Sequence, residues 1–212
     1  MQASVRLRTV ALPVTGNDKV EGISLLTQAH AEIVTRVITL NVVLSALSGD
    51  DAARLAPHLQ LVELTRDQRL KRRGRPPDFV YLVERGVACT TAEDVGIHGG
   101  EMGMMGREGY VGVGAVLGAT QAAYDVQVLA PGAAHRIAVA SLREAINASA
   151  TLRHAMLGYV HFFMLQVMRE AQTNARVTLE ARLSRWLLMM HDRVDGDELH
   201  LTHDRLATML GV

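Results

Sequence analysis

The chain has 212 residues, of which 49% are hydrophobic, enough to bury a sizeable core. Basic and acidic residues balance at 22 each, so any contact with nucleic acid must come from a local patch rather than from net charge. The one cysteine, Cys89, excludes an internal disulfide framework and a cysteine-ligated iron–sulfur cluster. No apolar run reaches the roughly 18 residues of a membrane span. These features predict a soluble, cytoplasmic protein with no membrane partner.

Residues 1–40 form an N-terminal extension whose role the sequence leaves open. The polar stretch TGNDKVEG at 15–22 separates VRLRTVALPV from a helical-looking segment, SLLTQAHAEIVTRVITL. A flexible extension, a docking arm and upstream sequence from a misassigned start all agree with this pattern.

Residues 41–140 have the texture of a β-roll. Two short helices are expected on either side of the turn Ser48-Gly49-Asp50, and the second ends near Pro57. Short strand-like runs follow, with turn signals about every eight to twelve residues: QLVEL, FVYLV, VACTT, DVQVLAP and AHRIAV. About 100 residues of this kind favour closure into a jelly roll.

Residues 141–176 are expected to form a short helix and then a long one, from about Thr151 to Arg176. A long helix that is apolar on one side needs a partner to bury against. We expect the same helix of a second subunit; packing only on the chain's own barrel is the alternative. The apolar stripe behind this prediction has steps of three and four residues: Met156, Val160, Phe163, Val167 and Ala171.

Residues 177–212 are predicted to be an incomplete winged-helix DNA-binding domain. LEARLSRWLLMMHDRV is amphipathic, Asp195-Gly196 is a tight-turn signal, and ELHL is a short strand. The stretch LTHDRLATMLGV has the features of the first helix and turn of a helix-turn-helix, with Thr202 as the N-cap and Gly211 as the turning residue. The second helix, which would read bases in the major groove, has no counterpart in the sequence. We therefore expect this chain to lack the recognition helix.

In their order along the chain, these stretches resemble the Crp/Fnr family of bacterial transcription regulators over roughly residues 41–212. The resemblance is carried by NVVLSALSGDDAARLAPHL, DFVYLVERGV, GREGYVGVGAVLG and LEARLSRWLLMMHDRVDGDELHLTHDRLATMLGV. It implies an α+β protein with a cyclic-nucleotide-binding-like jelly roll that senses a small-molecule effector, and a homodimer that binds double-stranded DNA. It also implies phosphate contacts from Thr202, His203 and Arg205. The implied effector pocket contains Gly112, Val113, Gly114, Ala122, Ala123, Val167 and Met168.

Departures from the family pattern narrow the range of candidate effectors. Members that bind cyclic AMP carry a Gly-Glu pair and, about ten residues later, an Arg-Ser pair whose arginine neutralises the cyclic phosphate. Here Gly112 is followed by Val113, and the downstream segment ATQAAYD has no arginine. Cyclic AMP is therefore disfavoured, as is the four-cysteine cluster of the oxygen-sensing branch. Haem, for which His154 and His161 offer ligands, is disfavoured as well. No cofactor is predicted, and an apolar or uncharged effector, or none, is expected.

The remaining motifs favour structural roles. GVGAVLG at 112–118 approaches a dinucleotide-binding glycine spacing but lacks a preceding strand and an acidic partner, which favours tight turns in a roll. Cys89 is expected to be a small buried hydrophobe. A basic run could contact phosphates, although a solvated strand end and loop is favoured for its members Arg69, Lys71, Arg72, Arg73 and Arg75.

No function in catalysis is expected from these residues. The sequence contains no nucleophile–base–acid set, no HExxH spacing and no Walker loop. The favoured hypothesis is that the protein is a DNA-binding regulator. The alternatives are a sensor and dimerisation module without DNA binding, and a small-molecule-binding protein with no transcriptional role.

Overall fold

The computed structural model describes residues 39–91, 103–196, 198–199, 202 and 206–207. Contacts divide the chain into residues 1–38 and 39–212, and the described residues all belong to the second unit. The predicted N-terminal extension therefore lies almost wholly outside the described residues. Within them, no helix is both long and apolar enough to cross a bilayer.

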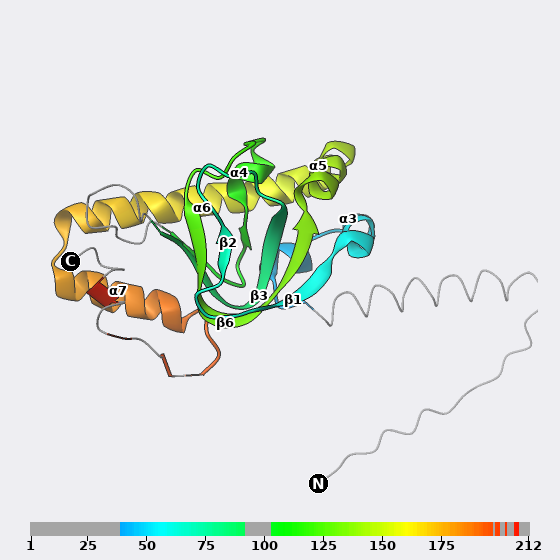
Figure 1. The fold of residues 1–212 in the computed structure, drawn as a ribbon. Helices are drawn as coiled ribbons and strands as arrows, with labels where there is room; N and C mark the ends of the chain where they lie inside the picture. Colours follow the sequence, from blue (N-terminus) through cyan, green and yellow to red (C-terminus); the bar gives the residue numbers. More distant parts are fainter. Residues whose placement is uncertain (1–38, 92–102, 197, 200–201, 203–205, 208–212) are drawn as a thin grey trace, which may run out of the picture. The chain divides into compact units, whose positions relative to one another are not determined.

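The described unit consists of a β-roll followed by three helices (Figure 1). Its elements in chain order are α2 (Val42–Ser45), α3 (Gly49–Leu55), η1 (Ala56–His58), β1 (Gln60–Leu64), β2 (Arg69–Lys71), β3 (Phe79–Thr91), β4 (Met104–Met105), β5 (Tyr110–Val111), α4 (Val113–Val116), β6 (Asp125–Ala138), α5 (Val139–Ala148), α6 (Ala150–Arg176) and α7 (Leu179–His191).

The sheet is antiparallel in every described pair, and its centre is the long β3–β6 pair. The strand order is β1-β6-β3-β4, with β2 added to β6 and β5 to β3. The β3–β6 register runs from Phe79↔Ala138 to Thr91↔Asp125, with register shifts between Val83 and Ala88. Such irregularities bend and twist a strand pair, which allows the two long strands to curl into a roll.

The helix α6 closes the roll with the very face that the sequence assigned to a partner subunit. Met156, Val160 and Phe163 are buried in the core of their own chain, and Val167 packs half-buried against it. The Tyr110 hydroxyl of β5 also donates to the Met156 carbonyl at 2.9 Å. The stripe was misassigned because the interior of the roll is itself apolar and supplies the surface that this face of the helix needs. Ala171 alone of the stripe is exposed.

The buried carboxylate of Asp51 joins the front of the roll to the start of α6. It accepts hydrogen bonds from Ser48 Oγ at 2.9 Å and from Ser149 Oγ and Thr151 Oγ1 at 2.6 Å each. Ser149 is the N-cap of α6, so one acid fixes both the cap and the neighbouring helix α3. Burial alone would raise the pKa of Asp51, but the three hydroxyl donors outweigh it and lower the pKa below 3.8.

Replacing Asp51 with alanine is expected to lower the free energy of unfolding near neutral pH by about 2–4 kcal/mol, because three hydrogen bonds to a charged acceptor are lost. The folded-state pKa lies below the unfolded one, so this contribution is present above the unfolded pKa and is lost as the pH falls through the folded pKa. Urea unfolding near pH 7 and again near pH 3 measures both effects. Asp50→Ala, at the exposed neighbour, is the control; an equal loss in both variants would contradict the role of Asp51.

Candidate effector site and its link to the C-terminal segment

The segment that the sequence assigned to the effector begins where β5 passes into α4. Gly112 is the N-cap of α4 and has φ 135°, a conformation that side-chain-bearing residues rarely adopt. From the other side, Arg143 of α5 donates to the carbonyl oxygens of Ala115 at 3.1 Å and Ala119 at 2.7 Å. The guanidinium thus holds the end of α4 and the turn after it, so the segment has a fixed place against α5.

The other predicted pocket residues are distributed around this segment. Ala122 is tied by backbone hydrogen bonds to Gly74 and Arg75, in the turn between β2 and β3. Val167 lies beside Gly103, the residue before β4: a Cβ at Gly103 would be 3.4 Å from its Cγ2. Met168 is 57% exposed, on the face of α6 turned away from the roll. The structure therefore places Met168 with the outer surface of α6 and not with the interior of the roll.

Lys71, at the end of β2, contradicts the expectation that the basic run is solvated. The four arginines of the run are exposed, but Lys71 keeps only 8% of its surface accessible. The reason is a bulge between Arg69 and Lys71, after which Leu70 and Lys71 are both buried. A bulge breaks the alternation of strand faces, and no residue pattern in the run announces it.

The Lys71 ammonium lies directly beside Gly112. A Cβ added at Gly112 would be 3.2 Å from Lys71 Nζ and 2.8 Å from Val80 Cγ2. Burial lowers the pKa of Lys71 from 10.5 to about 8. The predicted effector segment therefore lies next to a cation, Lys71, that was not predicted from the sequence.

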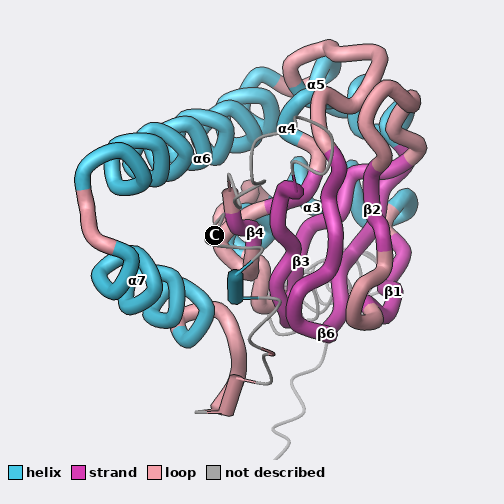
Figure 2. The backbone as a smooth tube through the Cα atoms, turned by 60° about the vertical axis from the view of Figure 1, so that its left-hand side comes forward, coloured by secondary structure: helices cyan, strands magenta, loops and turns pink. Residues whose placement is uncertain are grey.

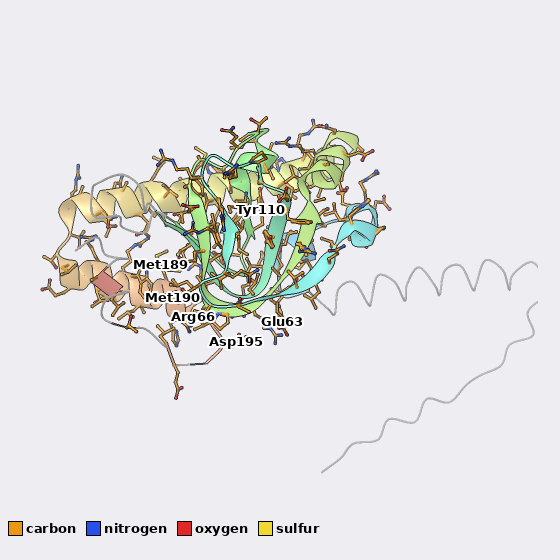
Figure 3. The ribbon with its side chains drawn as sticks, in the orientation of Figure 1. Glu63, Arg66, Tyr110, Met189, Met190 and Asp195 are labelled. Carbon is orange, nitrogen blue, oxygen red and sulfur yellow. The ribbon has the colours of Figure 1, made fainter. Side chains whose placement is uncertain are left out.

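A second, smaller core joins the roll to α7, which follows α6 after a turn and brings the chain back towards the strands (Figure 2). Trp186 and Met190 of α7 are buried there against residues of the roll. Met189 and Met190 lie near the end of α7 that adjoins the strands, whereas Tyr110 lies inside the roll (Figure 3). The roll contributes Val87, Cys89, Met104 and Leu129. Cys89 is buried, as predicted.

A buried guanidinium in the turn after α7 connects three parts of the molecule. Arg193 is 9% exposed, and its Nε donates to Glu108 Oε1, in the turn between β4 and β5, at 2.8 Å. Its Nη2 donates to Gln166 of α6 at 3.3 Å, and Gln166 in turn donates to the Met104 carbonyl at 2.9 Å. Nearby, Arg107 Nη2 pairs with Asp195 Oδ1 at 2.9 Å. The roll, α6 and the C-terminal segment therefore share one polar network.

The turn that carries Glu108 is held from α6 as well. Tyr159 packs so closely on Gly109 that a Cβ there would overlap its ring. Its hydroxyl is enclosed without a hydrogen-bond partner. Burial, followed by the neighbouring Glu108 carboxylate, raises the pKa of Tyr159 well above its ordinary value. The hydroxyl is therefore neutral and lies next to the Arg193 network.

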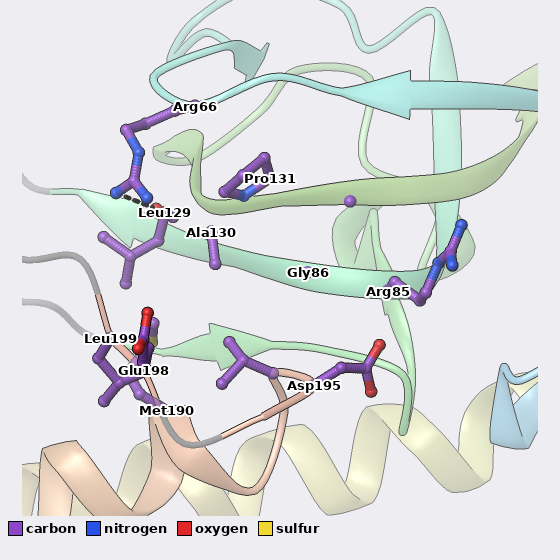
Figure 4. Close-up of a pocket in the computed structure, with 12 residues that line it drawn as sticks. Arg66, Arg85, Gly86, Leu129, Ala130, Pro131, Met190, Asp195, Glu198 and Leu199 are labelled. Carbon is purple, nitrogen blue, oxygen red and sulfur yellow. Dashed lines mark hydrogen bonds between the residues drawn. The ribbon is translucent and has the colours of Figure 1, made fainter.

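A pocket of about 500 Å³ opens beside this junction (Figure 4). One wall comes from the roll and includes Arg66, whose Nη1 donates to the Leu129 carbonyl at 3.2 Å. The opposite wall comes from the C-terminal segment and includes Asp195 and Glu198. The two surfaces are thus in contact through the second core and the Arg193 network, while a gap remains next to them.

Of the predicted phosphate-contacting residues, the structure describes only Thr202. It is exposed, and its carbonyl accepts from Leu206 N at 3.0 Å, the spacing of a helical hydrogen bond. His203, Arg205 and Gly211 lie outside the described residues, as do His200 and Leu201 of the predicted wing strand, whereas Glu198 and Leu199 of that strand are described and are not in a strand. His154 and His161, considered for haem, are both exposed on α6.

Several solved structures share this fold. The c-di-GMP responsive global regulator CLP from Xanthomonas campestris matches with a TM-score of 0.63 and 17% identity over 77% of this chain and 85% of that one. FixK2 from Bradyrhizobium japonicum matches with a TM-score of 0.62 and 13% identity over 73% of this chain and 78% of that one. The regulatory domain of PKA from Toxoplasma gondii, crystallised with cAMP, gives a TM-score of 0.51 and 16% identity over 70% and 56% of the two chains. No protein-family model and no curated protein matches the sequence.

The architecture is that of an α+β protein with a jelly-roll-like, cyclic-nucleotide-binding-type domain, as predicted. CLP and FixK2 are Crp/Fnr regulators, and the fold of this chain is Crp/Fnr-like. At these identities the likeness is one of fold.

Replacing Glu108 with alanine is expected to loosen the C-terminal segment from the roll, because Arg193 is left buried without its carboxylate at a cost of about 3–5 kcal/mol. Trp186, the only tryptophan, reports this directly from its position in the second core. Its emission should shift to the red and become more accessible to acrylamide. Glu63→Ala, at an exposed position on β1, is the control. A folded Glu108→Ala variant with wild-type Trp186 emission would show that the network does not hold α7.

Proposed function

We propose that the protein is a dimeric DNA-binding transcription regulator of the Crp/Fnr type, in which the β-roll senses a small effector and controls the C-terminal segment. The observation that carries this proposal is the Arg193 network, which joins the sensor roll, α6 and the segment after α7 through Glu108 and Gln166. A purely structural roll has no need of a polar link to a C-terminal extension. The Crp/Fnr-like fold supports the same assignment.

The path from effector to C-terminal segment is short in this proposal. The effector segment starts at Gly112 and is separated from the Glu108 turn only by the two residues of β5. A ligand that displaces α4 also displaces β5, and the displacement of β5 changes the position of Glu108. The ligand then shifts the equilibrium between docked and released forms of the C-terminal segment by its difference in affinity for them.

The dimer in this proposal uses the outer face of α6. On that face, residues 157, 161, 164, 168 and 171 recur with alternating steps of four and three, the spacing of a coiled-coil seam. Leu157, Met164 and Met168 are exposed apolar members of this seam. The occupant proposed is a second copy of α6, because the same seam on an antiparallel or parallel copy satisfies the repeat, whereas the inner stripe is already covered by the roll.

Met164→Glu is expected to convert a dimer into a monomer, because it places a charge at the centre of this seam where two copies would meet. Met164 is 54% exposed in the single chain, so the substitution does not disturb the core. Light scattering coupled to size-exclusion chromatography gives the mass. Leu61→Glu, at a 64% exposed leucine on β1, is the matched control. A Met164→Glu protein that keeps the mass of two chains would exclude this surface as the interface.

DNA binding in this proposal belongs to the segment after α7. Thr202, His203 and Arg205 are its proposed phosphate contacts, which position a protein on the duplex without reading its sequence. A two-fold dimer presents two such segments, and where each is completed by a recognition helix the preferred site is a palindrome.

Selection from random-sequence double-stranded DNA, made with a form of the protein that includes a recognition helix, is expected to enrich a two-fold-symmetric sequence with half-sites about 10–11 base pairs apart. The selected duplex should bind at least about a thousandfold more tightly than a scrambled one at the same salt concentration. Met164→Glu should bind half-sites weakly. No enrichment, together with an intact dimer, would instead assign the chain to a sensor and dimerisation module.

A further inference from the structure

Lys71 is a buried cation for which no partner is found among the described residues. It keeps 8% of its surface accessible, and within residues 39–91 and 103–196 no group accepts a hydrogen bond from its ammonium. Asp125, next to its β-sheet partner Val126, accepts instead from the backbone N–H of Arg73 at 3.0 Å. An unpaired ammonium in apolar surroundings is unfavourable, because it loses hydration without gaining a hydrogen bond.

The ammonium is nevertheless reachable from solvent. Among the described residues, the fully enclosed side-chain atoms without a partner are Arg107 Nε, His135 Nδ1 and Tyr159 Oη. Lys71 Nζ is not one of them, so the small accessible part of the side chain includes its charged end. With a pKa of about 8 the group is still roughly nine-tenths protonated near pH 7. A small anion can therefore reach a charged donor there.

The surroundings connect this donor to the effector segment. Lys71 Nζ faces the backbone of Gly112, whose missing side chain leaves the ammonium against the main chain at the start of α4. The same α4 is fixed on its other side by Arg143. An anion bound to Lys71 would thus touch the one short helix that leads, through β5, to Glu108.

We propose that Lys71 is the cation of the effector site and that the effector carries an oxyanion, a phosphate or a carboxylate, which pairs with Lys71 beside Gly112. This inference rests on the proposed sensor role of the roll and replaces the expectation, drawn from the missing arginine after Gly112, that the effector is uncharged. Lysine acts on such a group as a compact point charge with three donors, so it holds the anion without the two-pronged geometry of an arginine.

The test compares the thermal unfolding of the full chain with and without two oxyanion probes, inorganic phosphate and acetate, at constant ionic strength set with sodium chloride. At ten times the dissociation constant, a bound probe should raise the midpoint by about 3–6 °C. The probe that produces the larger shift identifies whether the site prefers a phosphate or a carboxylate.

Two variants assign the shift to Lys71. Lys71→Met should abolish it while raising the midpoint in the absence of probe, because an unpaired buried charge is replaced by an apolar side chain of similar length. Lys71→Arg should retain part of the shift. Arg72→Met, at the exposed neighbour, should retain all of it. An equal response of the wild type and Lys71→Met, or no response of the wild type to either probe, would overturn the proposal.

Failure of this inference is distinguishable from failure of the proposed function. If the DNA selection succeeds while Lys71→Met responds to the probes like the wild type, the protein is a regulator whose effector is not held by Lys71. If the probe response depends on Lys71 but no DNA sequence is enriched, the anion site stands and the DNA-binding role fails.

Discussion

The relative positions of the β4–β5 turn, α6 and the end of α7 depend on the hydrogen bonds of the Arg193 guanidinium. Its guanidinium is buried at a junction of three elements, where it meets one carboxylate, one amide oxygen and the Met189 carbonyl, to which Nη1 donates at 2.8 Å. A buried charge is tolerated only when its hydrogen-bonding groups are paired, and removing one partner leaves an uncompensated charge. The β4–β5 turn, α6 and the end of α7 must therefore keep their relative positions, or separate together.

The Arg193 network could control whether the C-terminal segment stays docked on the roll, because its hydrogen bonds require a defined geometry and their loss costs only a limited free energy. The apolar core around Trp186 packs α7 on the roll through hydrophobic contacts, which are not directional. The Glu108–Arg193 ion pair, by contrast, favours one position of the Glu108 turn, because its strength changes when the distance or angle between the two groups changes, even by a few tenths of an ångström in distance. A ligand with a modest difference in affinity for the two positions of the turn would change the fraction of docked chains measurably.

The sequence predicted the order of the elements well and their partners poorly. The roll and the helices follow from alternation and from steps of three and four residues, which are local properties of the chain. Which face of α6 packs on the roll does not follow, because Met156 and Met164 both belong to apolar stripes and only the tertiary structure decides between them. The Glu108–Arg193 pair spans 85 positions and leaves no local signal. The inward turn of Lys71 depends on one bulge, which the run RLKRRG does not announce.

The two buried cations of the described unit, Lys71 and Arg193, differ in whether a carboxylate pairs with them. Arg193 has a carboxylate from its own chain at 2.8 Å, and its surroundings are complete without any other molecule. Lys71 is buried and has no counter-charge among the residues that the structure describes, so its charge is compensated only if it loses its proton or if an anion binds. In the proposed function, the Arg193 arrangement fixes the docked form, and the Lys71 arrangement provides the site that binds the anion of the effector beside the start of α4. Because only the residues of β5 lie between Gly112 and the turn that carries Glu108, the proposal predicts that an anion bound at Lys71 changes the position of the carboxylate that holds Arg193.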